Sequence, residues 1–403
     1  MPRSFNSMKR NYLTLTLLLI CCSYIPSSPL AAAPRNGEIT IAFILPFNSA
    51  KVYIADMSQS KFYFPEETQI AAEFLQGAML AIDSLKENGL DARILVSDCG
   101  NDSVTIARVL QKPALRNADL IFAPFNGYAL KAVAQFGLKE QIPVISPLSV
   151  SIQDTLPNPF LILANASMNT HVKVMYDYLQ KQALLHRSLM LYQKKPADLA
   201  LVSELKNYVA EKKGGGKSIV KFIELTDSSK TTYWKLKDSL FRTDVNHIFI
   251  PSTNEPFVRA MLKQLYNLKD DYHFAVYGMP MWSSFSLIPQ QHFDSLNVTI
   301  SESFWLDKST PEAEWFKTKY RDQYEADPSA FSVRGFDEAL YFISRVTEND
   351  SLILHMSQAA PAKQLATVYD YRTSSPDNTA SYLDNHTVIL LQRKDGRWIP
   401  VEE

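Results

Sequence analysis

The stretch ITIAFIL, from Ile39 to Leu45, decides how the whole chain is interpreted. This continuous run of apolar and β-branched residues predicts a strand that is buried on both of its faces. Apolar residues then recur at helical spacing from Ile70 to Leu85, and Gly89 stands where that helix would end. The segment from Arg93 to Asp98 returns to strand character. A buried strand, a helix and a second strand in succession are typical of a parallel sheet covered by helices.

The same alternation continues through most of the chain. Two consecutive rounds of it predict an α/β fold made of two open units, followed by two long helices and a carboxyl-terminal hairpin. The residues from 371 to 385 are mostly polar and predict a loop. The further predicted strands are 120–125, 143–146, 188–193, 219–225, 247–251, 274–277 and 298–304. The further predicted helices are 104–110, 128–138, 168–182, 199–212, 232–242, 255–267, 311–324 and 331–346, and the hairpin spans 388–401.

Composition excludes several classes of protein. The 403 residues carry 41 Lys and Arg against 42 Asp and Glu, and a net charge of −1 argues against a dedicated nucleic-acid-binding protein. With 46% hydrophobic and 21% charged residues, the chain has an ordinary globular composition and the length of two or three domains. Only 12 residues are glycine. Gly214 to Gly216 lack the preceding glycine that a phosphate-binding loop requires, so we expect a surface turn there.

Residues 1–33 have the pattern of a secretory signal peptide. Lys9 and Arg10 precede an apolar run from Tyr12 to Ile25, and the small residues Ala31 to Ala33 follow it. The run is shorter than the roughly 20 apolar residues of a membrane span, and no span is expected in the mature chain. A buried amino-terminal helix is the alternative.

The three cysteines give two predictions. Cys21 and Cys22 leave lipoprotein anchoring open, although Ile20 is not the small residue that usually precedes a lipidated cysteine. Cys99 would be alone in the mature chain and cannot form an internal disulfide. Because it follows a strand, we expect a buried thiol rather than a nucleophile.

The motifs of common enzymes are missing. The seven histidines are scattered without metal-binding spacing, and neither a GxSxG elbow nor a GxGxxG turn occurs. Asp98 and Asp102 stand at strand ends, where carboxylates usually cap helices. The sequence therefore predicts a protein that is not an enzyme and that needs neither a cofactor nor a metal.

A ligand site is expected beyond the carboxyl ends of the strands, where open α/β sheets bind their ligands. The loops there carry hydroxyls, amides and aromatic rings with few charges, which suits an uncharged or zwitterionic small molecule. We predict in particular that Tyr128 and Trp282 face each other across a cleft. The candidate ligand-binding residues are Phe47, Asn48, Asn126, Tyr128, Ser146, Ser149, Tyr192, Gln193, Ser252, Thr253, Asn254 and Trp282.

Several strings in the chain are similar to one family. They resemble the type I periplasmic binding proteins of the leucine/isoleucine/valine-binding class, in the family's order and over nearly all of the mature chain. The matching segments are Gly77–Asp83 (GAMLAID), Asp98, Ile142–Ser146 (IPVIS), Tyr324, Pro328 and Gly335–Asp337 (GFD).

The resemblance implies two doubly wound parallel-sheet lobes that are joined by three crossings and close around a ligand. The crossings would lie near 161–165, 301–304 and Asp350, so that lobe 1 comprises 34–163 and 305–349 and lobe 2 comprises 164–304 and 350–403. Ser149 matches a hydroxyl that holds the ligand carboxylate in amino-acid-binding members. The acidic residue that usually holds the ammonium falls near Met281 and Trp282, where this chain has none.

The family also implies a function. We expect an exported, periplasmic solute-binding protein that serves an ABC importer and binds no nucleic acid. The strand ends at Ala123–Pro124 and Ser146–Ser149 resemble a branch related to lysin-motif proteins and to lipoproteins that activate peptidoglycan synthases. The alternative is therefore an envelope regulator of cell-wall synthesis that binds a protein or a wall fragment. The insertion from Ser49 to Glu67 would be its partner patch, a lid, or packing under a loop.

Overall fold

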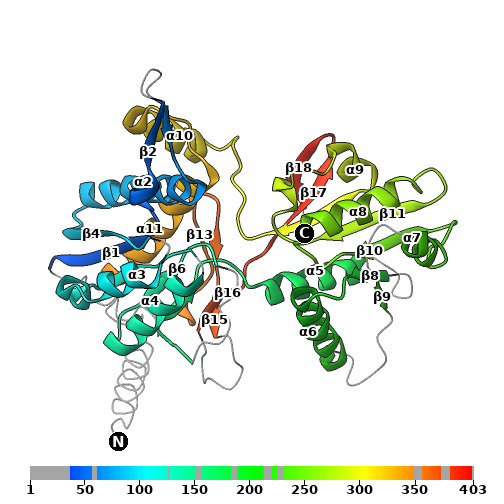
Figure 1. Ribbon diagram of the computed structural model, residues 1–403, viewed down its shortest axis with the longest axis horizontal. Helices are drawn as coiled ribbons and strands as arrows, with labels where there is room; N and C mark the ends of the chain where they lie inside the picture. Colours follow the sequence, from blue (N-terminus) through cyan, green and yellow to red (C-terminus); the bar gives the residue numbers. More distant parts are fainter. Residues whose placement is uncertain are drawn as a thin grey trace, which may run out of the picture.

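The computed structural model describes residues 37–56, 61–100, 102–125, 127–149, 157–182, 188–212, 220–225, 230–348, 356–373 and 382–401. Three predictions lie outside these residues: the signal peptide with its cysteines, the turn at Gly214 to Gly216, and a ligand contact by Asn126. No helix within the described ranges has the length and apolar character needed to cross a membrane. The chain forms two lobes that lie side by side (Figure 1).

Lobe 1 is built on a seven-stranded sheet in the order β15-β16-β7-β6-β5-β1-β4. Its strands are β1 (Ile39–Leu45), β4 (Ala92–Asp98), β5 (Leu120–Phe122), β6 (Val144–Ser146), β7 (Leu161–Leu163), β15 (Tyr371–Thr373) and β16 (Leu383–Asn385). Its helices are α2 (Glu66–Glu87), α3 (Ser103–Leu110), α4 (Gly127–Glu140), α10 (Pro311–Tyr324) and α11 (Ala330–Glu348).

Strand β1 confirms the prediction of a strand buried on both faces. Ile41 and Phe43 belong to the core under α2 and α11, whereas Ala42 and Ile44 belong to the core under α3 and α4. This alternation follows from the two-residue repeat of a strand. The ring of Phe43 stacks on that of Phe122 in the neighbouring β5, with centroids 4.7 Å apart.

Helices α2 and α11 pack at backbone distance. A Cβ added at Gly77 would lie 1.8 Å from the carbonyl oxygen of Ser332, and one at Gly335 would lie 1.9 Å from that of Phe74. Helix packing therefore explains Gly77 and Gly335, which both belong to segments that carry the resemblance. Each glycine leaves room for the backbone of the other helix.

Lobe 2 is built on a second seven-stranded sheet in the order β18-β17-β12-β11-β10-β8-β9. Helices α7, α8 and α9 cover one face and α5 and α6 the other. The strands are β8 (Ser188–Tyr192), β9 (Lys221–Glu224), β10 (Val245–Phe249), β11 (His273–Gly278), β12 (Val298–Glu302), β17 (Ile389–Lys394) and β18 (Arg397–Pro400). The helices are α5 (Met168–Gln182), α6 (Pro196–Lys212), α7 (Lys230–Lys237), α8 (Glu255–Tyr266) and α9 (Gln290–Ser295).

Three crossings connect the two sheets. The first follows β7 and leads into α5, the second follows β12 and leads into α10, and the third joins β16 to β17. The third crossing was expected near Asp350, but it lies at 386–388, because β15 and β16 belong to the sheet of lobe 1. The loop predicted over 371–385 is wrong at both of its ends for the same reason. Tyr371 and Leu383 are buried in the lobe 1 core. The segment is mostly polar, so its sequence pattern gave no signal for the two short strands at its ends.

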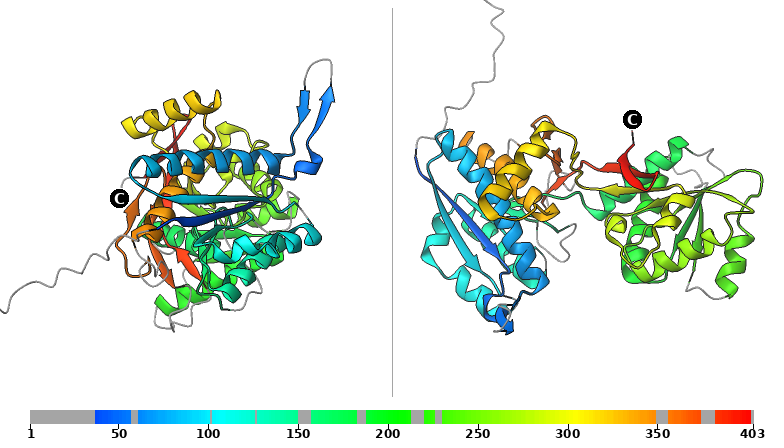
Figure 2. Two further views of the ribbon diagram at one scale, coloured as in Figure 1. Left: turned by 90° about the vertical axis from the view of Figure 1, so that its left-hand side faces the viewer. Right: turned by 90° about the horizontal axis from the view of Figure 1, so that it is seen from above.

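Two hairpins correspond to segments that the sequence analysis singled out. The carboxyl-terminal hairpin is confirmed: β17 pairs with β18 around Asp395 and Gly396, which both have positive φ. The insertion after β1 forms a second hairpin, β2 (Tyr53–Asp56) and β3 (Lys61–Tyr63), which is a separate two-stranded sheet. Figure 2 shows it projecting from lobe 1.

Candidate ligand site at the facing edges of the two lobes

The topology brings the carboxyl ends of both sets of strands to the crossings. Ser146 at the end of β6 pairs with Leu163 at the end of β7, immediately before the first crossing. In lobe 2, Gly278 of β11 pairs with Ile300 of β12, two residues before the second crossing begins at Glu302. Because the neighbouring strands are parallel, their loops lie along the same edges. We call these the facing edges of lobes 1 and 2.

At the edge of lobe 1, Asp98 organises the loop after β1. Its carboxylate accepts hydrogen bonds from the backbone N–H groups of Asn48 (3.0 Å), Ser49 (2.9 Å) and Gly100 (2.9 Å), and from the Ser49 hydroxyl (2.7 Å). Burial raises the pKa of Asp98, but these hydrogen bonds outweigh burial and leave the pKa below its ordinary value. Asp98 therefore acts as an ionised anchor of this loop, including the first residue of the short 3-10 turn Ser49–Lys51. Asp102 does cap α3, as predicted, and accepts from the N–H groups of Val104 and Thr105.

The candidates of lobe 1 differ in accessibility. Asn48 is buried, and its amide donates to the Pro46 carbonyl and to Glu67, both at 3.2 Å. Ser146 is fully buried. Phe47 packs against the lobe 1 core. Tyr128, in the first turn of α4, is 65% exposed, and Ser149 is half-buried. Among the described candidates of this edge, Tyr128, Ser149 and the half-buried Phe47 offer side-chain surface to a ligand.

At the edge of lobe 2, most of the predicted polar residues bind each other. Ser252 is fully buried; its hydroxyl donates to Asp198 at 3.1 Å and accepts from the Gln193 amide at 3.4 Å. Asn254 caps α8 by accepting from the N–H of Phe257 at 3.1 Å. The side chains of Tyr192 and Asn254 are half-buried and that of Thr253 is exposed, so these three stay accessible.

The prediction that Trp282 faces Tyr128 is wrong. Trp282 is fully buried in the lobe 2 core, and its indole N–H donates to the Ser252 carbonyl at 2.8 Å. A Cβ added at Gly278 would lie 2.4 Å from the indole ring. The glycine four residues earlier is the sequence signal that was missed, because it leaves the space that the ring fills. Only Tyr128 of the two rings is accessible.

Sequence reasoning also missed Glu302, the last residue of β12. Its carboxylate accepts from the Met281 N–H at 3.3 Å and from the Ser283 hydroxyl at 2.9 Å. Burial raises the pKa of Glu302 to about 7, although both hydrogen bonds oppose the rise. The family's acidic residue is missing from the loop at Met281, and Glu302 brings a carboxylate to the backbone of that loop from a different strand. No motif pointed to it, because its place follows from the pairing of β11 and β12.

Arg334 is a second residue that the sequence did not single out. Although buried in α11, it donates to the Pro147 carbonyl at 2.9 Å, to the Asn165 amide oxygen, and to Glu338 at 3.2 Å. Its guanidinium lies over the ring of Phe304, 4.8 Å from the centroid. Arg334 therefore joins the edge loop of lobe 1 to the first and second crossings. Burial raises the pKa of Glu338, and the Arg334 charge opposes this rise.

Further polar contacts bind the crossings to each other. The imidazole Nε2 of His171, in α5, lies 3.0 Å from the hydroxyl of Ser303 on the second crossing. Burial lowers the pKa of His171 to about 3, so the ring is neutral. The Asn385 amide donates to the Ala164 carbonyl at 3.0 Å and thereby connects the third crossing to the first.

Cys99, just beyond β4, is a free and buried thiol, as predicted. Burial, together with the neighbouring Asp98 charge, raises its pKa to about 12. A thiol with so high a pKa stays protonated near neutral pH and is a poor nucleophile.

Comparison with known proteins agrees with this architecture. A family model described as "Periplasmic binding protein" matches residues 67–385. Among solved structures, a putative branched-chain amino acid ABC transporter protein from Rhodospirillum rubrum is 15% identical, with a TM-score of 0.64 over 91% of this chain and 100% of that one. An ABC transporter substrate-binding protein from Desulfitobacterium hafniense in complex with Leu is 14% identical, with a TM-score of 0.59 over 91% and 100%.

A third structure, a branched-chain amino acid transporter substrate-binding protein from Streptococcus pneumoniae in complex with isoleucine, is 14% identical, with a TM-score of 0.55 over 90% of this chain and 98% of that one. No curated protein matches the chain. The predicted fold of two doubly wound lobes is confirmed.

Proposed function

The chain belongs to the periplasmic binding protein family, and from this premise we propose that it is an exported solute-binding protein whose lobes close on one small ligand. A ligand that touches both facing edges binds the closed arrangement better than the open one, and this differential affinity shifts the population toward closure. In the proposed role, closure presents the two lobes to the membrane component of an ABC importer. The structural neighbours named as parts of ABC transporters support that partner.

The observation that carries the proposal is the position of Glu302. Its half-buried carboxyl group lies at the edge of lobe 2 where the second crossing begins, and Tyr128 and Ser149, which are exposed and half-buried, belong to the edge of lobe 1. We infer a small zwitterionic ligand whose amino group binds Glu302 and whose other polar atoms bind lobe 1. Neighbours solved with leucine and isoleucine support this ligand class.

The raised pKa of Glu302 makes the proposal testable in detail. With a pKa of about 7, the carboxyl is partly protonated at neutral pH. A cationic amino group close by favours the ionised form and lowers the pKa, so binding should release a proton. Calorimetric titration with the twenty standard amino acids, repeated in buffers of different ionisation enthalpy, measures that release. Native mass spectrometry of the purified protein first shows whether a small molecule has been retained.

Glu302→Gln keeps the shape of the side chain and removes its charge. We expect ligand affinity to fall by about 10- to 100-fold, as the loss of a charge-assisted hydrogen bond implies, and the proton release to disappear. Glu312→Gln, an exposed position on α10, is the matched control and should leave affinity unchanged. Equal affinities of all three proteins would remove Glu302 from the site. Turnover of the ligand to a product would overturn the binding role itself.

A second candidate function is an envelope regulator that binds a protein or a wall fragment. The observation that favours it is the β2–β3 hairpin, which pairs with neither seven-stranded sheet and projects from lobe 1 (Figure 2). Small-angle scattering separates the two candidates. A radius of gyration that decreases on saturation with a small ligand supports the solute-binding role, and an unchanged radius together with hairpin-dependent capture of a partner supports the regulator.

A further inference from the structure

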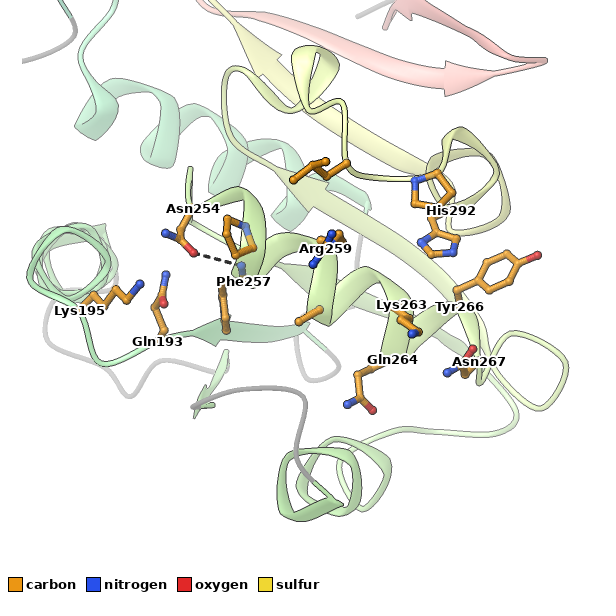
Figure 3. Close-up of a pocket in the computed structure, with 14 residues that line it drawn as sticks. Gln193, Lys195, Asn254, Phe257, Arg259, Lys263, Gln264, Tyr266, Asn267 and His292 are labelled. Atoms are coloured by element: carbon orange, nitrogen blue, oxygen red, sulfur yellow. Dashed lines mark hydrogen bonds between the residues drawn. The ribbon is translucent and has the colours of Figure 1, made fainter.

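Lobe 2 carries a groove of about 1030 Å³ that follows α8 away from the facing edge. It begins at Gln193 and Asn254 and ends at Tyr266 and His292, as Figure 3 shows. None of its 14 lining residues is an Asp or a Glu, whereas three are cations: Lys195, Arg259 and Lys263. The groove therefore has a positive lining in a protein with a net charge of only −1.

These cations are poorly neutralised. All three are exposed, and none forms a salt bridge with a carboxylate of the described ranges. Glu255 lies one helical turn before Arg259, but its carboxylate accepts from the N–H of Leu287 at 2.7 Å. Arg259 and Lys263 are four residues apart, a spacing at which like charges on a helix repel each other. The helix thus keeps two repelling cations beside an open groove, and the carboxylate on the same helix, Glu255, is bound to the backbone of Leu287.

The charge of Lys263 acts inside the groove. Burial is the main cause of the lowered pKa of His292, and the nearby Lys263 charge lowers it further. Lys195, at the other end, is close enough to the buried Asp198 to oppose the rise of its pKa. A cation therefore lies near each end of the groove, and an anionic ligand would replace water around these exposed side chains.

The uncharged lining indicates what kind of anion fits. Asn267 is exposed and its amide can donate to and accept from the backbone of a peptide, whereas the amide oxygen of Asn254 already caps α8 and leaves its NH₂ group as a donor. The stacked rings of Tyr266 and His292, whose centroids are 4.4 Å apart, add apolar surface at the far end. Exposed cations that are spread along a helix hold a small anion weakly, but they match several carboxylates of one extended chain.

We propose that the α8 groove binds an acidic, extended peptide segment of a protein partner. This proposal concerns lobe 2 alone and does not depend on a ligand between the lobes. It gives the protein a second interaction surface, recognised by charge and backbone hydrogen bonds.

The test measures binding of a fluorescent glutamate-rich peptide to the full mature chain by anisotropy. Its partner peptide has every glutamate replaced by glutamine. We expect only the acidic peptide to bind, and its affinity to fall as salt screens the exposed charges over a Debye length of about 8 Å. The variant Lys195→Gln, Arg259→Gln, Lys263→Gln should lose about tenfold in affinity, the sum of three exposed ion pairs.

A matched control removes the same charge elsewhere. Lys86, Lys319 and Lys363 are exposed in lobe 1, and their triple replacement by glutamine should leave binding unchanged. The proposal fails if the wild-type protein does not bind the acidic peptide at low salt, if both triple variants lose affinity equally, or if the groove variant binds normally. Tighter binding of an oligonucleotide or of polyphosphate than of the peptide would also overturn it, because the groove would then serve a different class of polyanion.

Discussion

The contact between α2 and α11 and the three crossings differ in what holds them together. Gly77 and Gly335 let the two helices meet at backbone distance, and an apolar core surrounds the contact. The crossings are held by the polar contacts of Arg334, His171 and Asn385. Close apolar packing has one solution and makes lobe 1 rigid. Hinge motion is absorbed by a few loop or element-terminal residues, and the crossings consist of such residues.

The largest expected effect comes from disrupting the contact between α2 and α11. Gly335→Val would place its side chain against the carbonyl of Phe74, where even a Cβ lies 1.9 Å from the oxygen. Overpacking usually costs about 1–3 kcal/mol, but a backbone cannot move aside as a side chain can. We expect a loss of about 4 kcal/mol or more in the free energy of unfolding, measured by urea denaturation. Ala330→Val, at an exposed position of the same helix, controls for helix propensity and should cost below about 1 kcal/mol.

The second prediction disrupts the polar contacts that hold the crossings. Arg334→Met removes the links to Pro147 and Asn165 and leaves Glu338 without its buried partner. Loss of one member of a buried pair costs about 3–5 kcal/mol. Burial already raises the pKa of Glu338, so the unpaired carboxyl can take up a proton and become neutral. This keeps the loss at the low end of that range, and we expect the free energy of unfolding to fall by about 3 kcal/mol.

The double variant Arg334→Met, Glu338→Gln separates the charge from the links. It should recover part of the stability, because no unpaired carboxyl remains. We expect reduced ligand affinity in both variants, because both lack the links from Arg334 to the crossings. If the double variant is less stable than Arg334→Met alone, the pair does not behave as a buried ion pair, and the assignment of Arg334 to the joints loses its support.

Sequence patterns predicted the parts of the molecule that depend on local periodicity. The double burial of β1, the cap at Asp102 and the carboxyl-terminal hairpin all follow from spacing within a few residues. The sequence failed where pairing between distant segments decides. The third crossing depends on β16 pairing with β7, more than two hundred residues away in the chain.

The candidate site shows the same limit. Residue type indicated polar loops at the strand ends, but it could not tell a buried Ser252 from an exposed Thr253. The importance of Glu302 and Arg334 depends on contacts between elements that are far apart in sequence. Ser149 and Asn254 stay predictions of ligand contact.

The third prediction uses pH to show that the second crossing carries a titrating group. The pKa of Glu302 is raised from 4.5 to about 7, so its contribution to stability is fully present below pH 4.5 and is lost as the pH rises through 7. Because the Glu302 side chain is half-exposed, solvent screens part of the effect of this pKa shift on stability. We expect the contribution of Glu302 to the free energy of unfolding to change by about 1–2 kcal/mol. The unfolding free energy of the wild type minus that of Glu302→Gln should fall by this amount between the two pH values. A difference that does not change with pH would contradict a raised pKa.

The smallest expected effect concerns a crossing contact that does not titrate. Ser303→Ala removes the partner of His171 Nε2, and the other ring nitrogen of this buried histidine has no hydrogen-bond partner among the described residues. One lost hydrogen bond of this kind costs about 1 kcal/mol.

The depressed pKa of His171, about 3, contributes stability that is present above pH 6.5 and is lost as the pH falls. Wild type and variant share that contribution, so it cancels in their difference. The cost of Ser303→Ala should therefore be the same at about pH 5.5 and pH 7.5, unlike the difference caused by Glu302→Gln, while Ser295→Ala on the exposed surface should cost almost nothing. A cost that changes between the two pH values would mean that the Ser303 contact alters the protonation of His171, and the crossings would then contain a second titrating group.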